Sequence, residues 1–219
     1  MDRFRLAKIV RWVLHLHYDV RLSGVECMYD GCVHLVLPNH PAYIDPLILF
    51  SECGEVPLCP MVDERFFRNA LFRRVLRMAN AVLVPNLEKT HDRVNGVAQA
   101  KHLTDIAVTS LQEGRDMVFY PSGHVKLTDC EIIGNRRLAY EVIQQLPDNV
   151  EVVMVCTRGL ESSRWSKLRP KKWHWRRRVR MHFAVMTDQL KSWATEDKRS
   201  FNAHLEEWYN QMSATLEAQ

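Results

Sequence analysis

Short apolar runs and longer amphipathic segments alternate along most of the chain. The runs at 33–37 and 150–156 are rich in Val and Leu, which is typical of buried strands, whereas 92–114 and 198–218 hold apolar residues at helical spacing. The same reading predicts β-rich segments at 18–28 and 32–40 with a turn at 29–31, strands at 56–62, 82–85, 116–121, 150–160 and 178–187, and helices at 4–18, 43–53, 63–81 and 133–147. The alternation predicts a single α/β domain with a mostly parallel or mixed central sheet flanked by helices.

For two of the predicted helices, the sequence also predicts where the helix ends or which face is apolar. The helix at 92–114 ends at Gly114, which stands in the C-cap position. The helix at 63–81 places its apolar side chains on one face and arginines on the other. That predicted apolar face consists of Phe66, Phe67, Ala70, Leu71, Val75 and Met78.

The first predicted helix, 4–18, mixes apolar and aromatic residues with Arg5, Lys8 and Arg11. This composition suits a helix that lies on a membrane surface, with its cations at the level of the headgroups and Trp12 at the boundary. A helix packed on the protein's own core shows the same pattern, and the sequence leaves both interpretations open. No run approaches the roughly 18 uncharged apolar residues of a membrane-spanning helix.

Charge is unevenly distributed along the chain. The formal net charge is +4, with a pI of about 8.8, but the segment 164–180 is densely basic and holds no acidic residue. Its basic and Trp side chains suit nucleic acid, anionic headgroups, the phosphates of coenzyme A or an acidic carrier protein. The six cysteines show no CxxC pair, and no signal peptide is visible. We therefore expect reduced thiols in a cytosol-facing protein, without a metal site or a disulfide framework.

His40 and Asp45 lie five positions apart in the turn after a predicted strand. A neutral imidazole can take a proton from a hydroxyl while a nearby carboxylate fixes its tautomer and stabilises the imidazolium. The spacing is too wide for one helical face, so this chemistry needs a strand-to-helix turn, which Pro41 and Pro46 stiffen. The alternative is structural: Asp45 caps the helix that begins at Pro46, and His40 is incidental. Spacing alone does not decide, since a second pair of this kind occurs at 124–129.

Three blocks of the sequence resemble one enzyme family. Residues 39–45, NHPAYID, resemble the NHxxxxD motif of the glycerolipid acyltransferases, which include the 1-acylglycerol-3-phosphate acyltransferases. Residues 118–124, VFYPSGH, are similar to that family's Phe-Pro-Glu-Gly block, and 150–160 to its closing Val-Pro-Val strand. The closest likeness is to the acyltransferase domain of the 2-acylglycerophosphoethanolamine acyltransferases. The likeness covers most of the chain, namely residues 4–49, 81–126 and 150–168.

The resemblance implies acyl transfer without a covalent enzyme intermediate. His40 would act as the general base on an acceptor hydroxyl, with Asp45 orienting it, and the alkoxide would attack the thioester of an acyl-CoA or acyl-carrier protein. The implied acceptor is a lysophospholipid or a related glycerol phosphate, and neither a cofactor nor a metal is implied. The residues implied in substrate binding are Asn39, which also braces the turn, Ser122, Gly123, His124 and Lys126.

The chain departs from the family pattern at several positions. Ser122 replaces the Glu of the second block and Tyr120 its usual Phe, so a negative charge is missing where the family binds the glycerol phosphate. Asn80 and Asn86 stand where the family tends to show a Gly and an Arg. Two alternatives follow: a hydrolase of lipids or acyl thioesters, and a lipid-binding relative without catalysis. A serine hydrolase built on Ser122 and His124 is disfavoured, because Tyr120 interrupts the Gly-x-Ser-x-Gly elbow.

Together with the resemblance, the basic segment and the first helix favour a membrane surface and the acyl donor over nucleic acid. We expect residues 1–20 to form a membrane-interface helix and 21–219 to form the acyltransferase domain. The protein is expected to be peripheral on the cytoplasmic face of a membrane. Its expected partners are phospholipid and an acyl-CoA or acyl-carrier protein, and its oligomeric state is left open.

Overall fold

The central strand β2 (Val33–Pro38) is buried on both of its faces. Leu35 and Leu37 belong to one core cluster, whereas Val36 between them belongs to another, because successive side chains of a strand point to opposite sides. Such two-sided burial is typical of a sheet covered by helices on both faces. The structure is a computed structural model that describes residues 2–64, 70–84, 93–172 and 174–218.

Helices and strands alternate along the chain as the sequence predicts. In chain order the elements are α1 (Arg3–His15), β1 (Tyr18–Ser23), the 3-10 helix η1 (Val25–Tyr29), β2 (Val33–Pro38), α2 (Asp45–Glu52), β3 (Cys59–Asp63), α3 (Ala70–Met78), β4 (Val82–Val84), α4 (Arg93–Gln112), β5 (Met117–Val118), α5 (Leu138–Gln144), β6 (Val150–Arg158), β7 (Arg177–Val185), α6 (Thr187–Trp193) and α7 (Lys198–Ala218).

The strands form one mixed sheet in the order β1-β7-β6-β2-β5-β3-β4. β6, β2, β5, β3 and β4 run parallel to one another, whereas β7 is antiparallel to β6 and β1 runs parallel to β7. The chain moves outward from β2 to β3 and β4 and then returns to β5, which lies directly beside β2. Ligand crevices of open α/β sheets form at such reversals, outside the carboxyl ends of the strands.

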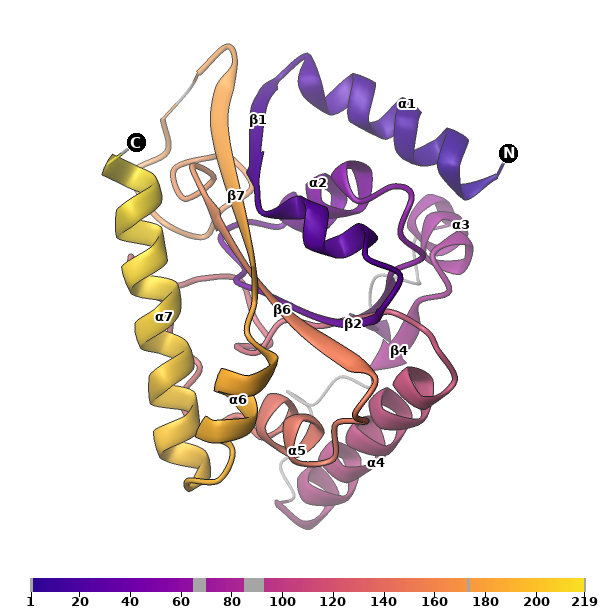
Figure 1. Cartoon of the computed structure of the whole chain (residues 1–219). Helices are drawn as coiled ribbons and strands as arrows, with labels where there is room; N and C mark the ends of the chain where they lie inside the picture. The colour runs from indigo at the N-terminus through magenta and orange to yellow at the C-terminus, as the bar shows by residue number, and fades with distance from the viewer. Residues whose placement is uncertain (1, 65–69, 85–92, 173, 219) are drawn as a thin grey trace.

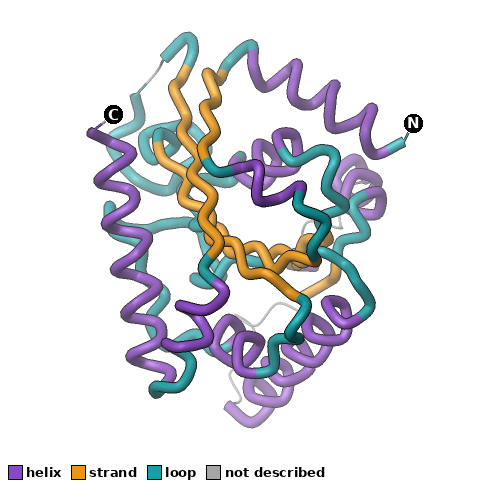
Figure 2. The backbone as a smooth tube through the Cα atoms, in the orientation of Figure 1, coloured by secondary structure: helices purple, strands orange, loops and turns teal. Residues whose placement is uncertain are grey.

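Helices cover both faces of the sheet (Figures 1 and 2). On one face, side chains from α1, α2 and η1, such as Leu14 and Ile48, join Val153 of β6 in a single core cluster. On the other face, α4, α5, α6 and α7 pack on the alternate strand positions, with Phe201 and Met154 fully buried. Each buried large apolar side chain stabilises the fold by about 1.5–3 kcal/mol, so these two layers are the main source of the sheet's stability. The predicted single α/β domain with a mixed sheet flanked by helices is confirmed.

The long predicted helices are confirmed with small shifts at their ends. α4 ends just before Gly114, whose φ of +77° is left-handed and whose N–H donates to the Leu111 carbonyl. α3 occupies the second half of the helix predicted at 63–81. Apart from Met78, the side chains of the apolar face predicted for that helix lie outside the described residues.

The segment 25–28, predicted to be β-rich, instead forms part of η1. Gly24, with a φ of +72°, takes the chain off the sheet beside β7, where an added Cβ atom would lie 2.2 Å from the Phe183 carbonyl oxygen. The turn at 29–31 therefore does not join neighbouring strands: β1 pairs with β7, and β6 and β7 lie between β1 and β2.

Two further differences have tertiary causes. α5 begins at Leu138 instead of near 133, because the N–H groups of Ile133 and Gly134 donate to the Glu206 carboxylate of α7, at 2.6 and 2.7 Å. These contacts hold the preceding residues in a loop. α6 was not predicted at all; its buried Leu190 packs into the core beneath β6.

The two faces of α1 have different surroundings. Leu6, Ala7 and Leu14 are buried as the helix packs on α2. Arg11 and His15 pair with the buried Glu52 carboxylate, at 3.1 and 2.7 Å. The outward side chains include Phe4, Ile9, Trp12, Val13 and Leu16, which are 45–67% exposed. The helix is thus docked on the protein and also leaves an apolar face uncovered, whose contact with a membrane stays a prediction.

Within the described residues, every helix is too short or too polar to cross a membrane.

Candidate active site

The loops that leave β2 and β5 lie side by side at the carboxyl ends of these strands. β2 continues directly into the turn that carries His40. β5 is extended by one bond, from the Phe119 N–H to the Val36 carbonyl at 3.3 Å, and stops before Pro121, which has no N–H. The two loops are joined where the Lys126 N–H donates to the His40 carbonyl, at 2.8 Å.

The Asp45 carboxylate lies at the centre of these contacts. Asp45 is the first residue of α2 and is 2% exposed. Its Oδ2 accepts hydrogen bonds from Nδ1 of His40, at 2.9 Å, and from the Ala42 N–H, at 3.2 Å. Its Oδ1 accepts from the Tyr120 hydroxyl, at 2.9 Å. These three bonds offset the cost of burying a charged group.

The contact with Asp45 determines the tautomer of His40. An ionised carboxylate can only accept, so Nδ1 of His40 carries the hydrogen, and the neutral ring keeps its lone pair on Nε2. The ring stacks on Tyr120, with centroids 4.2 Å apart, and meets the edge of Tyr43 at 6.4 Å. Because the His40 side chain is 14% exposed, it remains open to a ligand. The arrangement is that of a general base with its orienting carboxylate.

The helix-capping interpretation of Asp45 does not hold. The N-cap residue of α2 is Ile44, and it makes no side-chain capping bond. The Asp45 carboxylate instead reaches back to the N–H of Ala42, three residues earlier, and to His40. The turn therefore uses this carboxylate to hold the imidazole.

Tyr120 was singled out in the sequence only as a departure from the family block. Burial, reinforced by the neighbouring Asp45 charge, raises the pKa of its phenol well above the usual range. The hydroxyl therefore stays protonated and remains a hydrogen-bond donor to Asp45 at every physiological pH. In the sequence, the polar hydroxyl of Tyr120 at the end of a predicted strand was the one feature that could have indicated a site residue.

Asn39 joins the turn to β6. Its Nδ2 donates to the Thr157 carbonyl at 3.0 Å, and its Oδ1 accepts from the Thr157 N–H at 2.7 Å. The backbone N–H of Asn39 donates to the Val155 carbonyl, at 3.0 Å. The side chain is buried, so these bonds brace the turn from behind, while a role in substrate binding stays a prediction.

Ser122, Gly123 and His124 form a tight turn after β5. Gly123 has a left-handed φ of +67°, which favours glycine. The Ser122 hydroxyl donates to the His124 carbonyl at 3.1 Å, and Nδ1 of His124 lies 3.3 Å from the Val125 carbonyl. Both side chains lie in the described part of the chain, and no hydrogen bond joins them. The nucleophile–base pair of a serine hydrolase is therefore not formed.

His124 is neutral in this setting rather than cationic. Burial, together with the positive charges of Arg136 and Lys167, lowers the pKa of its imidazole. Both of these cationic side chains are exposed. The positive charge at the rim of the turn therefore comes from Arg136 and Lys167.

Lys126 and Glu131 place two buried ionisable groups next to the His40 turn. Lys126 is 2% exposed and Glu131 is 3% exposed. Burial raises the pKa of the Glu131 carboxyl, against the lowering effects of the Ser122 hydroxyl and the Lys126 charge. His40 and Asp45 also interact electrostatically with this carboxyl. Among the described residues, the buried Oε2 of Glu131 has no hydrogen-bond partner.

Sequence reasoning missed Glu131, and no local signal marked it. Its backbone is held by Asn210 of α7, which accepts from its N–H at 2.7 Å and donates to its carbonyl at 3.3 Å. The carboxyl thus reaches the neighbourhood of His40 only because α7 packs against the loop after β5. A carboxyl group, which is missing from position 122, is therefore present nearby in space.

Comparisons with known proteins bear on the fold. No family model matches the sequence, and no curated protein matches it significantly. Among solved structures, the chain is similar to the 1-acyl-sn-glycerophosphate (LPA) acyltransferase, PlsC, from Thermotoga maritima, with a TM-score of 0.66 and 14% sequence identity. The match covers 98% of this chain and 79% of that one. The likeness establishes the fold.

Tyr120→Phe removes one of the three hydrogen bonds to the buried Asp45 carboxylate. We expect the free energy of unfolding to fall by about 1–3 kcal/mol, because a buried acceptor loses its donor. Urea unfolding monitored by circular dichroism measures the change. Tyr140→Phe is the matched control, since its exposed hydroxyl donates to the Glu196 carbonyl and the loss of this bond should cost less. An equal decrease in the free energy of unfolding in the two variants would contradict the role of Tyr120 as a hydrogen-bond donor to the buried Asp45 carboxylate.

Glu131→Gln should change how stability depends on pH. The pKa of the Glu131 carboxyl is higher in the folded state than its ordinary value of 4.5. Just above pH 4.5, the carboxyl is therefore still protonated in the folded protein but ionised in the unfolded chain. The contribution of Glu131 to the free energy of unfolding of the wild type is therefore greatest below pH 4.5, and it falls as the pH rises toward the pKa of the folded state. The fall is about 1.4 kcal/mol per pH unit while only the folded state is protonated.

Urea unfolding of wild type and Glu131→Gln between about pH 4 and pH 8 measures this difference, which should grow in favour of the variant as the pH rises. Glu207→Gln, at an exposed position of α7, should run parallel to wild type. Parallel curves for Glu131→Gln as well would show that the folded state does not favour the protonated carboxyl.

Proposed function

We propose that this chain is an O-acyltransferase that moves a fatty acyl group from acyl-CoA or acyl-carrier protein to a lysophospholipid or glycerol-phosphate-type acceptor. One observation carries the proposal: Nδ1 of His40 lies 2.9 Å from a buried, fully hydrogen-bonded Asp45 carboxylate at the carboxyl end of β2. The fold that holds this pair is shared with a solved glycerophosphate acyltransferase, which supports the same reaction class.

In the proposed reaction, Nε2 of His40 removes the proton from an acceptor hydroxyl as its oxygen attacks the thioester carbonyl carbon. Asp45 stabilises the imidazolium that forms. The tetrahedral intermediate then breaks its carbon–sulfur bond, and the imidazolium returns its proton to the departing thiolate. The products are the acylated acceptor and the free thiol of the donor, and the enzyme is not covalently modified.

Exposed cations at the mouth of the turn support an anionic acceptor. Arg136 lies beside Gly123, where an added Cβ atom would come within 3.9 Å of the guanidinium Nε. Nζ of Lys167 lies over the Tyr43 ring, 5.7 Å from its centroid, and Tyr43 in turn contacts His40. We assign the acceptor phosphate to Arg136 and Lys167, because neutral His124 and buried Lys126 are poorer phosphate ligands.

A basic hollow near the end of β6 supports a phosphate-bearing donor. Its lining includes Arg176, Arg177 and Arg178, and its volume is about 350 Å³. Arg177 donates to the Gly159 carbonyl at 3.3 Å and to the Ser162 hydroxyl at 2.9 Å. Gly159 directly follows β6, at the same end of the sheet as His40. We assign this hollow to the phosphates of coenzyme A or to the acidic surface of a carrier protein.

A membrane surface would supply both long-chain substrates. The uncovered apolar face of α1 and the half-exposed Trp165 provide groups that partition to an interface. The Trp165 carbonyl accepts from the Tyr43 N–H at 3.0 Å, so that apolar surface adjoins the candidate site. We propose that the protein is peripheral, with the α1 face toward the bilayer.

His40→Ala should abolish most acyl transfer. We expect kcat/KM to fall by about 10²–10⁴-fold, because a general base contributes this much. The measurement uses labelled acyl-CoA or acyl-carrier protein with a panel of lysophospholipids and glycerol 3-phosphate in detergent micelles, and it quantifies free fatty acid in the same samples. His102→Ala, at an exposed position of α4, is the control and should keep its activity.

Each possible result of this assay has a separate meaning. A folded His40→Ala protein with full activity would exclude His40 as the base. Free fatty acid without acylated acceptor would identify a hydrolase. No product with any donor, carrier protein included, would favour the non-catalytic lipid-binding relative.

Trp12→Ala should weaken binding to vesicles of mixed neutral and anionic phospholipid by about tenfold or more, because a large exposed apolar side chain is lost from α1. Sedimentation of the protein with sucrose-loaded vesicles measures the change. Tyr29→Ala, which removes a similarly exposed side chain from η1, should bind like wild type. If both variants bind as wild type does, the α1 face is not the contact surface.

A further inference from the structure

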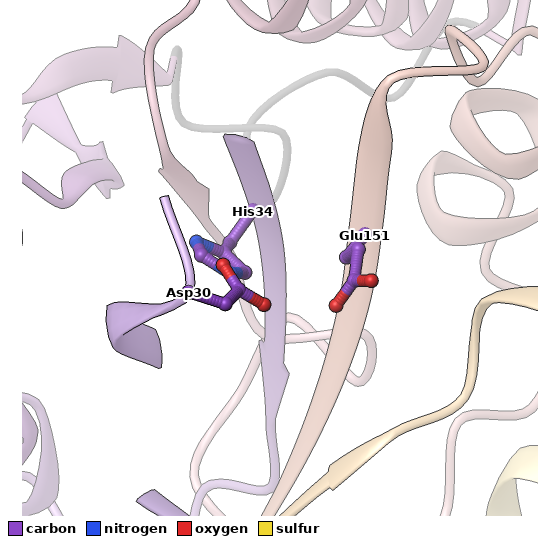
Figure 3. Close-up of side chains that lie close together, drawn as sticks. All are labelled: Asp30, His34 and Glu151. Atoms are coloured by element: carbon purple, nitrogen blue, oxygen red, sulfur yellow. The ribbon is translucent and has the colours of Figure 1, made fainter. Parts of the chain in front are cut away.

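A second cluster of chemically active side chains lies at the opposite end of β2, away from His40. His34 and Glu151 are register partners on β2 and β6, so their side chains emerge on the same face of the sheet. Asp30 lies in the turn after η1, and its carboxylate lies between the other two side chains in Figure 3. His34 and His40 are separated by about 20 Å of nearly extended chain, so this cluster is separate from the candidate active site.

A buried carboxylate holds the ring of His34. Asp116, just before β5, accepts from the His34 backbone N–H at 2.7 Å and lies 3.2 Å from Nδ1 of the ring. Because the carboxylate can only accept, Nδ1 carries the hydrogen and the neutral ring presents its lone pair at Nε2. A carboxylate behind a histidine in this way orients the ring as a metal ligand and raises its basicity.

The other ring nitrogen faces acidic groups. Nε2 of His34 is buried and, within the described chain, has no hydrogen-bond partner of acceptable geometry, although it lies 3.1 Å from Oδ1 of Asp30. A lone pair that faces two carboxylates at close range is unfavourable, and either a proton on Nε2 or a metal cation ligated by all three groups relieves the repulsion. One nitrogen and two carboxylate oxygens are a ligand set that a divalent transition metal accepts.

We propose that Asp30, His34 and Glu151 bind one Zn²⁺-type divalent cation. Their ligand atoms lie within 4.8 Å of one another. Ligands around a tetrahedral zinc ion with bonds of about 2.1 Å are about 3.4 Å apart, so the side chains must close by up to about 1.4 Å. The exposed side chain of Asp30 has the freedom to make that movement.

The surroundings favour zinc over magnesium. The Cys32 N–H donates to Oδ1 of Asp30 at 2.8 Å, so the exposed Cys32 lies next to one of the three ligands, and His34 supplies a nitrogen ligand. Zinc accepts nitrogen and sulfur ligands, whereas magnesium prefers oxygen alone.

Such an ion would have a structural role. It would tie the η1 turn to β2 and β6 at the amino end of the sheet, where no step of the proposed acyl transfer takes place. The sequence predicted no metal site because the three ligands come from separate segments without recognisable spacing.

The test is Zn²⁺ binding to the whole purified chain after chelation and dialysis. Isothermal titration with Zn²⁺ alone should show one equivalent bound. A hundredfold excess over the dissociation constant should raise the midpoint of thermal unfolding by about 5–10 °C. Mg²⁺ in place of Zn²⁺ should give no such shift.

Matched variants locate the ion. Asp30→Asn and Glu151→Gln should each weaken binding at least tenfold, and Asp116→Asn by about 10–100-fold. Glu196→Gln is the control, because it alters another histidine–carboxylate pair, with His204, and should bind like wild type. The proposal is overturned if no Zn²⁺ binds, if Mg²⁺ stabilises the chain equally, or if Asp30→Asn and Glu151→Gln bind as tightly as wild type.

Discussion

The buried carboxylate of Asp45 is the group on which the candidate site depends. A charge removed from water must be satisfied by hydrogen bonds, and three donors do so here: the ring of His40, the Ala42 N–H and the Tyr120 hydroxyl. The donors come from the β2–α2 turn and from the end of β5. The need to satisfy one charge therefore holds two loops together and orients the imidazole in the same step.

The surroundings of this pair are more polar than a core normally allows. Lys126 and Glu131 are both almost fully buried, and burying ionisable groups is costly unless they are well compensated. Asn210 of α7 clamps the backbone of Glu131, and Tyr209 on the same helix donates to the Leu37 carbonyl of β2 at 2.7 Å. The C-terminal helix thus holds the floor of the site in place. Polar groups kept buried at such cost are typical of a site that carries chemistry.

The two ends of the parallel central strands carry different groups of side chains. At their carboxyl ends, the loops after β2 and β5 present His40, and the exposed cations Arg136 and Lys167 lie near this turn. At their amino ends, the register of β2 and β6 places His34 beside Glu151, and the Asp30 carboxylate lies close to both. The first end suits an anionic substrate that enters and leaves, whereas the second suits a small cation that stays. The outward face of α1 adds an apolar surface, so lipid, phosphate and metal would each meet a different part of the fold.

The sequence by itself determined the order of strands and helices, because apolar periodicity is a local property, and it placed His40 and Asp45 in one stiffened turn. Only the tertiary structure decided which strands pair, since β1 joins β7 from the far end of the chain. It also decided that the Tyr120 hydroxyl contacts Asp45, and that packing against α7 holds Glu131 close to His40. Contacts between distant segments depend on how the helices pack across the sheet, and no local pattern of residues specifies that packing.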